Sequence, residues 1–126
     1  MREITIKPTG NSMLPFIRPN DTVSLICDCR DIKKYDVVLY QAYGVSVLHR
    51  VIGEENDRYI ICGDNTAVIE KVPKKKVAAK AVKIERHGRM IDMNKPIIKL
   101  MLRIWYELRV KRAVRKINKM INKTKN

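Results

Sequence analysis

Cysteines are scarce in this sequence, and long apolar runs are absent. Its 126 residues contain three cysteines, Cys27, Cys29 and Cys62, and no CxxC pair. An odd number without that spacing indicates neither a disulfide framework nor a four-ligand zinc site, so we expect reduced thiols in or near a core. No stretch reaches the roughly 18 apolar residues of a transmembrane helix, and the N-terminus lacks the apolar segment of a signal peptide. We therefore expect a cytoplasmic protein or one peripheral to a membrane.

Acidic residues are scarce in the last quarter of the chain. Residues 95–126 contain eleven Lys or Arg and one acid, Glu107, whereas residues 1–94 contain sixteen basic and twelve acidic residues. Most of the formal net charge of +14 therefore belongs to the C-terminal segment, and it predicts an anionic partner. The segment has few aromatic residues to stack on bases, and the rest of the chain shows no basic stripe, which disfavours nucleic acid. An anionic membrane surface and a solvated basic face are the two open alternatives.

Short runs rich in β-branched and aromatic residues fill the first ninety positions. Turn signals such as RPND, AYG, GEEND and CGDN separate them, and HGR predicts a hairpin turn. This spacing predicts a mainly β protein with antiparallel sheets. The charged stretch 71–77 is interpreted as a solvated loop. The predicted strands are 3–7, 22–26, 36–40, 45–52 and 58–62, with further strand structure between 77 and 93.

From residue 94 onward the pattern is that of a helix, with Asn94 as its cap and Pro96 in its first turn. We therefore divide the chain into a β domain, residues 1–93, and a basic amphipathic helical tail, residues 94–126. The tail has two apolar stripes on opposite sides, which predicts either a bend near residues 107–109 or two different contact surfaces. The first stripe is Ile97, Met101, Ile104, Trp105 and Leu108, and the second is Val110, Ala113, Val114, Ile117 and Ile121.

Only two histidines are available for acid–base chemistry. His87 lies in the HGR turn and is interpreted as solvated. His49 lies inside a predicted strand, where alternation places it on one face with Val45, Val47 and Val51. A histidine in such a position is usually structural, so spacing alone does not make His49 catalytic.

Ser12, in the stretch TGNSMLPFI, is either a turn residue or a nucleophile. A serine hydroxyl needs a base within hydrogen-bond reach before it can attack a carbonyl. Asp64, in CGDN, is by itself an ordinary turn former, and Glu70 is interpreted as a surface residue. A Ser–His–acid constellation is defined by geometry, so the order of these residues permits one without establishing it.

Several segments resemble, in the same order, the motifs of signal peptidase I. GNSMLPFIRPNDTVSL resembles the element in which the nucleophile opens a Ser-Met-x-Pro sequence, and KKYDVVLYQ resembles the strand that follows. VLHRVIG resembles the segment with the general base, CGDNTAV the Gly-Asp-Asn box, and KKVAAKAVKIERHG the last strand of the body. The resemblance covers residues 9 to about 88. It implies the coiled antiparallel β-sheets that signal peptidases share with LexA-type autoproteases.

Position 49 distinguishes the two catalytic types of this family. Bacterial members have lysine there, whereas archaeal and endoplasmic-reticulum members have histidine, as this chain does. The resemblance implies a serine endopeptidase that cleaves a leader or precursor peptide after small residues, with Ser12 as nucleophile, His49 as general base, and neither metal nor cofactor. It places Asp64 at the Asp of the Gly-Asp-Asn box and Glu70 where histidine-type members have another Asp. Asp64 is the favoured third catalytic residue, and Glu70 is the alternative.

The apolar run after Ser12 is expected to line the substrate groove, where an extended peptide could add as a strand. This run is Met13, Leu14, Pro15, Phe16 and Ile17. Gly10 stands where many bacterial members have a side-chain oxyanion donor, so the backbone N–H of Ser12 is expected to serve instead.

Two other functions compete with the peptidase. One is a LexA-like regulatory domain that cleaves itself or a partner and binds nucleic acid through the basic tail. The histidine at position 49, in place of lysine, disfavours this alternative. The other is a non-catalytic relic of the fold that binds peptides.

Overall fold

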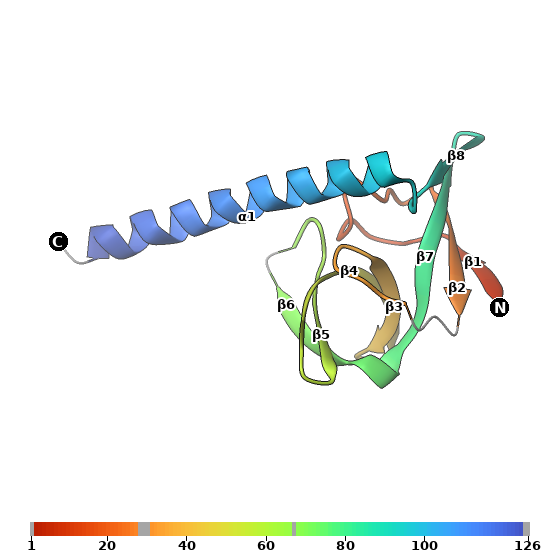
Figure 1. Ribbon diagram of the computed structural model, residues 1–126, viewed down its shortest axis with the longest axis horizontal. Helices are drawn as coiled ribbons and strands as arrows, with labels where there is room; N and C mark the ends of the chain where they lie inside the picture. The colour runs from red at the N-terminus through yellow and green to blue at the C-terminus, as the bar shows by residue number, and fades with distance from the viewer. Residues whose placement is uncertain (1, 28–30, 67, 125–126) are drawn as a thin grey trace. The chain divides into compact units, whose positions relative to one another are not determined.

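The computed structural model describes residues 2–27, 31–66 and 68–124 of the chain. The chain divides into two compact units, Met1–Asn94 and Lys95–Asn126. Over the residues described, the first unit is built of strands and the second is a single helix (Figure 1). The prediction of a mainly β protein with antiparallel sheets and a C-terminal helix is therefore confirmed.

In the described part of the first unit, eight strands form one sheet, and every pairing in it is antiparallel. The strand order is β1-β2-β7-β3-β4-β5-β6, and β8 pairs with β7. The sheet coils, so that β3, β4, β5 and β6 curve round one end of it (Figure 1). The elements are β1 (Glu3–Ile6), β2 (Thr22–Cys27), β3 (Val37–Ala42), β4 (Val45–Glu55), β5 (Arg58–Cys62), β6 (Ile69–Pro73), a 3-10 turn (Lys74–Lys76), β7 (Val77–Arg86) and β8 (Arg89–Asp92).

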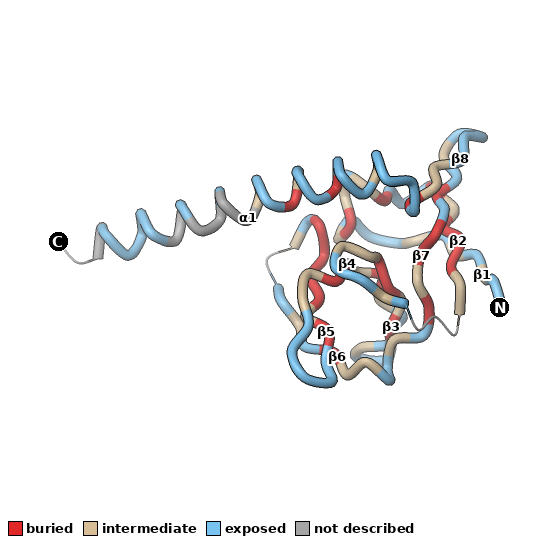
Figure 2. Tube along the Cα trace, viewed as in Figure 1, coloured by how far each residue is buried: buried red, intermediate tan, exposed pale blue. Residues whose placement is uncertain are grey.

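Both faces of β3 and of the middle of β4 contain buried side chains, because alternation along each strand sends neighbouring side chains into two different cores. Val37 and Leu48 belong to the first core, which also contains side chains of β2 and β7. Val38, Tyr40 and Val51 belong to the second core, which also contains side chains of β5 and β6. Figure 2 shows buried positions along these strands. His49 and Arg50, which are consecutive on β4, therefore face different environments.

The predicted turn at AYG and the predicted hairpin turn at HGR are both present, and each connects two paired strands. Tyr43 and Gly44 have φ of 54° and 77°, and His87 and Gly88 have φ of 52° and 77°. Positive φ at both central residues matches the twist of the flanking strands. His87 is exposed in its turn, as expected. The remaining strands begin and end within three residues of their predicted bounds.

Strand β6 was not expected, because the sequence favours a connection over residues 66–77. Glu, Lys and Pro are depleted in strands, and β6 contains one of each among its five residues. The pairing of β6 with β5 places Glu70 opposite Ile61 and buries Val72. The interpretation of Glu70 as a surface residue is therefore wrong, since the strand turns this side chain toward the second core.

The free cysteines that the structure describes are the buried Cys62 and the half-buried Cys27. Their placement agrees with the expectation of reduced thiols in or near a core. Cys29 lies outside the described residues.

The second unit is one helix, α1 (Pro96–Thr124). In the first stripe, the side chains of Ile97, Met101, Ile104 and Leu108 are exposed. In the second stripe, Ile121 is exposed, whereas the side chains of Val110, Ala113, Val114 and Ile117 lie outside the described part of the structure. Within the described residues, no helix has the length and apolar character needed to cross a bilayer.

Candidate active site

The loop between β1 and β2, residues 7–21, contains Ser12 and is called the Ser12 loop. Two apolar side chains of this loop, Met13 and Ile17, are buried in the first core, with exposed fractions of 4% and 2%. A backbone hydrogen bond of 3.0 Å from Ile17 N to the Met13 carbonyl closes a tight turn between them. Because its neighbour Met13 is fixed in the core, Ser12 is held at a defined place.

An ion pair fixes the far end of the Ser12 loop. Arg86, at the end of β7, donates from Nε and Nη2 to the carboxylate of Asp21 at 2.8 and 2.7 Å, and from Nη2 to the Phe16 carbonyl at 2.8 Å. Asp21 also accepts a hydrogen bond of 2.8 Å from the backbone N–H of Arg18. The hydrogen bonds from Arg86 lower the pKa of Asp21 despite the opposing effect of its burial. The loop is therefore attached to the sheet by charge as well as by its apolar side chains.

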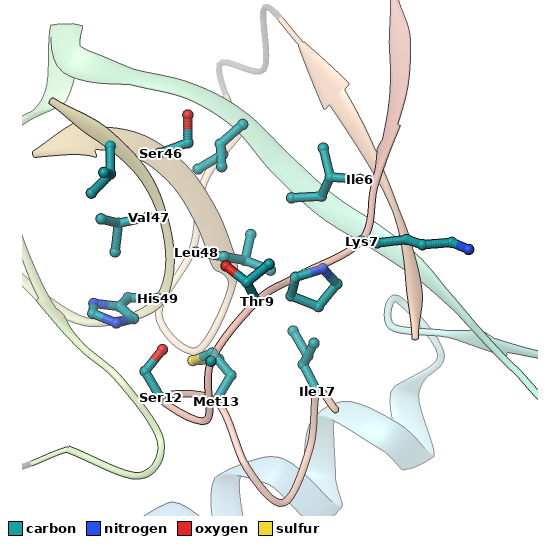
Figure 3. Close-up of a pocket in the computed structure, with 14 residues that line it drawn as sticks. Ile6, Lys7, Thr9, Ser12, Met13, Ile17, Ser46, Val47, Leu48 and His49 are labelled. Carbon is teal, nitrogen blue, oxygen red and sulfur yellow. The ribbon is translucent and has the colours of Figure 1, made fainter. Parts of the chain in front are cut away.

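An open groove of about 570 Å³ lies between the Ser12 loop and the first half of β4. Figure 3 shows the hydroxyl of Ser12 directed toward the imidazole of His49 in this groove. Within the described residues, no hydrogen bond joins that hydroxyl to His49. Catalytic hydrogen bonds are often long before substrate binds, so this geometry is compatible with a nucleophile and its base. The groove is lined by residues 6–10 and 45–49, together with Ser12, Met13, Ile17 and Leu39.

Only part of the apolar run that was expected to bind substrate reaches this groove. Met13 and Ile17 line it, whereas Leu14, Pro15 and Phe16 do not. The ring of Phe16 lies instead beside the Arg50 guanidinium, 5.3 Å from ring centre to the guanidinium carbon. The turn between Met13 and Ile17 directs the intervening residues away from the groove. The sequence alone suggested an extended run and did not reveal this turn.

The turn after β5 meets both Ser12 and His49. Asn65 donates from its backbone N–H to the Ser12 carbonyl at 2.8 Å and from its side chain to the Asn11 carbonyl at 3.1 Å. A β-carbon at Gly63 would lie 2.9 Å from the Ser12 carbonyl oxygen and 3.0 Å from Nε2 of His49. Only glycine permits so close an approach, so the Gly-Asp-Asn turn brings the candidate nucleophile and base together.

The other ring nitrogen of His49 meets a hydroxyl. Nδ1 lies 3.2 Å from the hydroxyl oxygen of Tyr40, and that hydroxyl donates to Oε2 of Glu70 at 3.0 Å. Burial lowers the pKa of His49 below its ordinary value of 6.5, while the charges of Glu70 and Asp64 act in the opposite direction. His49 is therefore predominantly neutral at pH 7 and able to accept a proton.

Asp64, the favoured third member of a triad, is bound elsewhere. Its two carboxylate oxygens accept hydrogen bonds from Nε and Nη2 of Arg50, each at 2.7 Å, and both side chains are fully buried. The same guanidinium donates to the Tyr35 carbonyl at 2.7 Å. Of the two candidate acids, Glu70 is thus the one joined to His49, and it is joined through Tyr40.

Tyr40 was not recognised as a site residue from the sequence. The AYG hairpin pairs Ala42 with Val45, and continuing this register pairs Tyr40 with Val47 and Val38 with His49. Tyr40 is therefore diagonal to His49 on the same face of neighbouring strands, within reach of a long side chain. The hairpin register was the signal that could have identified it.

Within the described residues, no group of three or more His, Cys, Asp or Glu side chains is placed to hold a metal ion. The site is thus a serine, a neutral histidine, a tyrosine and a carboxylate beside an open groove. No protein-family model and no curated protein sequence matches the chain.

Proposed function

We propose that this protein is a signal-peptidase-like serine endopeptidase that cleaves a leader or precursor peptide after small residues. The observation that carries the proposal is the Ser12 hydroxyl directed toward a neutral His49 in an open groove. The preference for small residues comes from the resemblance of the motifs. The coiled antiparallel sheet is compatible with the signal-peptidase and LexA-like fold, which we propose on the same basis.

The proposed reaction has two halves. Nε2 of His49 takes the proton of the Ser12 hydroxyl as its oxygen attacks the scissile carbonyl, and the imidazolium then gives that proton to the leaving amine. Water hydrolyses the resulting acyl-enzyme, with His49 again as base. The backbone N–H of Ser12 is the proposed donor to the oxyanion.

A strand edge that has no partner strand among the described residues supports peptide binding in the groove. Over residues 45–49, β4 pairs with β3, whereas its pairing with β5 begins at Arg50. The free edge of this segment lines the groove, so an extended peptide can form backbone hydrogen bonds with it. A peptide bound in this way would run alongside residues 45–49 and pass close to both Ser12 and His49.

The test is cleavage of a leader peptide with small residues before the scissile bond. We expect Ser12→Ala and His49→Ala each to reduce kcat by about 1,000-fold or more, because the nucleophile and its base act as a unit. His87→Ala, in the exposed HGR turn, is the matched control and should keep wild-type activity. Equal cleavage by all four proteins would refute the assignment. Binding of the peptide without any acyl-enzyme would favour the non-catalytic relic.

We further propose that α1 binds an anionic membrane surface. Exposed basic side chains, Arg112, Arg115 and Lys119, occur on the same helix as the exposed apolar Met120 and Ile121. This combination is typical of interfacial helices. Co-sedimentation with phosphatidylserine vesicles should weaken when Arg112, Arg115 and Lys119 are changed to Gln, and should not when Lys34, Lys75 and Lys76 of the first unit are changed. Salt-dependent DNA binding by α1 with no vesicle binding would favour the LexA-like alternative.

A further inference from the structure

The hydroxyl of Tyr40 lies between the candidate base and a carboxylate. Its oxygen is 3.2 Å from Nδ1 of His49 and 3.0 Å from Oε2 of Glu70. Tyr40 itself is 1% exposed, in the second core, and its ring meets the imidazole edge-on with 6.2 Å between centroids. Its position is therefore set by packing before any hydrogen bond is considered.

The hydroxyl of Tyr40 has one proton, which it can donate to only one of these two neighbours. An ionised Glu70 can only accept, so the phenolic proton of Tyr40 must point toward it. If that proton pointed to His49 instead, two acceptor oxygens would face each other at 3.0 Å with no hydrogen between them. The oxygen of Tyr40 must then accept from Nδ1–H of His49. This arrangement leaves Nε2 of the neutral ring without a proton.

Nε2 is the nitrogen on the side of the Ser12 loop. A β-carbon at Gly63 would lie within 3.0 Å of both Nε2 and the Ser12 carbonyl oxygen, so these atoms share one small region. In Ser–His–Asp enzymes the acid itself accepts the hydrogen bond from Nδ1–H and thereby selects this tautomer. In this chain the carboxylate of Glu70 is one hydroxyl further away.

We propose that Tyr40 is a positioning residue that holds His49 in the tautomer protonated on Nδ1 and connects it to Glu70. The Nε2 lone pair is thereby directed to the Ser12 proton. When that proton moves to Nε2, the Nδ1 proton stays hydrogen-bonded to Tyr40 and the phenolic proton stays on Tyr40, hydrogen-bonded to Glu70. The imidazolium charge is stabilised by the phenol dipole and, at longer range, by the carboxylate.

The acidity of Tyr40 fits this role. Burial and the hydrogen bond to Glu70 raise the pKa of Tyr40 well above its ordinary value of 10.0. The phenol therefore remains protonated at neutral pH. Glu70 and Asp64 are the charged groups that act on His49, and both raise its pKa against the larger effect of burial.

The tautomer of His49 can be read directly by long-range proton–nitrogen NMR of the imidazole at about pH 8, where a histidine of ordinary pKa is neutral. We expect the wild-type ring to be protonated on Nδ1, and Tyr40→Phe to populate the Nε2–H form. Tyr43→Phe removes the same hydroxyl from a 95% exposed side chain in the adjacent turn and should leave the spectrum unchanged. The exposed His87 provides an internal reference.

Kinetics with the leader peptide give a second readout. This kinetic measurement rests on the proposed function, whereas the tautomer of His49 is measured without substrate and does not. Tyr40 does not line the groove, so Tyr40→Phe should lower kcat by about 10- to 100-fold and leave KM unchanged, less than the effect of losing the whole base. Rotation of His49 out of reach of Ser12 would also lower kcat, and the tautomer spectrum distinguishes the two causes.

The outcomes separate the positioning role from the peptidase. A wild-type His49 protonated on Nε2, or a tautomer that Tyr40→Phe does not alter, would overturn the role of Tyr40 even if the protein cleaves peptides. The expected tautomer change in a protein that cleaves nothing would support the role of Tyr40 and refute the proposed function. If Tyr40→Phe fails to fold, Glu70→Gln tests the same connection, because its amide can donate to the Tyr40 oxygen and compete with Nδ1–H.

Discussion

Two consecutive residues of β4, His49 and Arg50, face opposite sides of the sheet and each is linked to a carboxylate from the segment after β5. Arg50 binds Asp64 directly, through two hydrogen bonds of 2.7 Å in a fully buried pair. His49 reaches Glu70 through one intervening hydroxyl, with contacts of 3.2 and 3.0 Å, in a half-buried environment open to the groove. The Arg50–Asp64 pair is therefore a structural contact, whereas His49 is a group that can change its charge.

The Arg50–Asp64 pair positions the turn that approaches the candidate catalytic residues. A buried ion pair is rigid because breaking it leaves an uncompensated charge in the core. Asp64 is flanked by Gly63, beside Nε2 of His49, and Asn65, which donates to Ser12. The acid favoured from the sequence as the catalytic partner of His49 thus contributes by fixing the backbone on either side of itself.

Removal of Asp64 is the most severe way to break this arrangement. We expect Asp64→Asn to lower the free energy of unfolding by about 3–5 kcal/mol, because the Arg50 guanidinium would stay buried without its counter-charge. Urea unfolding followed through the methyl signals of Val51 and Ile61, two fully buried residues of the second core, measures this loss. Glu54→Gln is the matched control.

Glu54 forms a 3.0 Å ion pair with Lys74 on the surface of the same sheet. Its loss should change the free energy of unfolding very little, since solvent screens the pair. A similar destabilisation by Asp64→Asn and Glu54→Gln would contradict the structural role assigned to the Arg50–Asp64 pair.

The sequence predicted most of the sheet because its strands are short, β-branched and bounded by turn signals. Residues 58–62 form β5 as predicted, and the HGR turn lies where it was expected. Strand β6 was missed because its backbone pairing with β5 outweighs the weak strand preference of Glu70, Lys71 and Pro73.

The candidate site was less accessible to sequence reasoning than the sheet. Motif order predicted Ser12 and His49 as partners, and both line one groove, but it could not divide Asp64 and Glu70 between two partners. That division depends on which face of β4 each neighbouring side chain occupies and on which carboxylate the chain brings to that face. Tyr40 required the register of β3 against β4, which the hairpin turn determines.

Asp21 allows the comparison to be extended to a second buried carboxylate, at the base of the Ser12 loop. We expect Asp21→Asn to lower the free energy of unfolding by about 1.5–3 kcal/mol at pH 7, because it loses charge-assisted hydrogen bonds from Arg86. Amide exchange in the Ser12 loop should also accelerate. Glu55→Gln, which breaks a half-exposed pair of 2.9 Å with Lys71, is the matched control and should have little effect.

The effect of Asp21 should depend on pH in a defined direction. Arg86 lowers the pKa of Asp21 in the folded protein below its ordinary value of 3.8. The stabilisation is therefore fully present above the unfolded-state pKa and is lost as the pH falls through the lower folded-state value. The gap in stability between wild type and Asp21→Asn should shrink as the pH falls below about 4. A gap that widens in acid would contradict this assignment.

Glu70→Gln should change the stability least, and it tests most directly the difference between Glu70 and Asp64. Because the glutamine keeps the shape of the side chain in a half-buried site, we expect the free energy of unfolding to change by less than about 1 kcal/mol. The negative charge of Glu70 raises the pKa of His49, so its removal should lower that pKa further. Because the proposed base acts in its neutral form, the acid limb of kcat/KM should move to lower pH than in the wild type. Glu54→Gln should not move the limb. A shift to higher pH, or a loss of stability as large as that of Asp64→Asn, would mean that Glu70 and Asp64 have similar roles, and the distinction between the two faces of β4 would be lost.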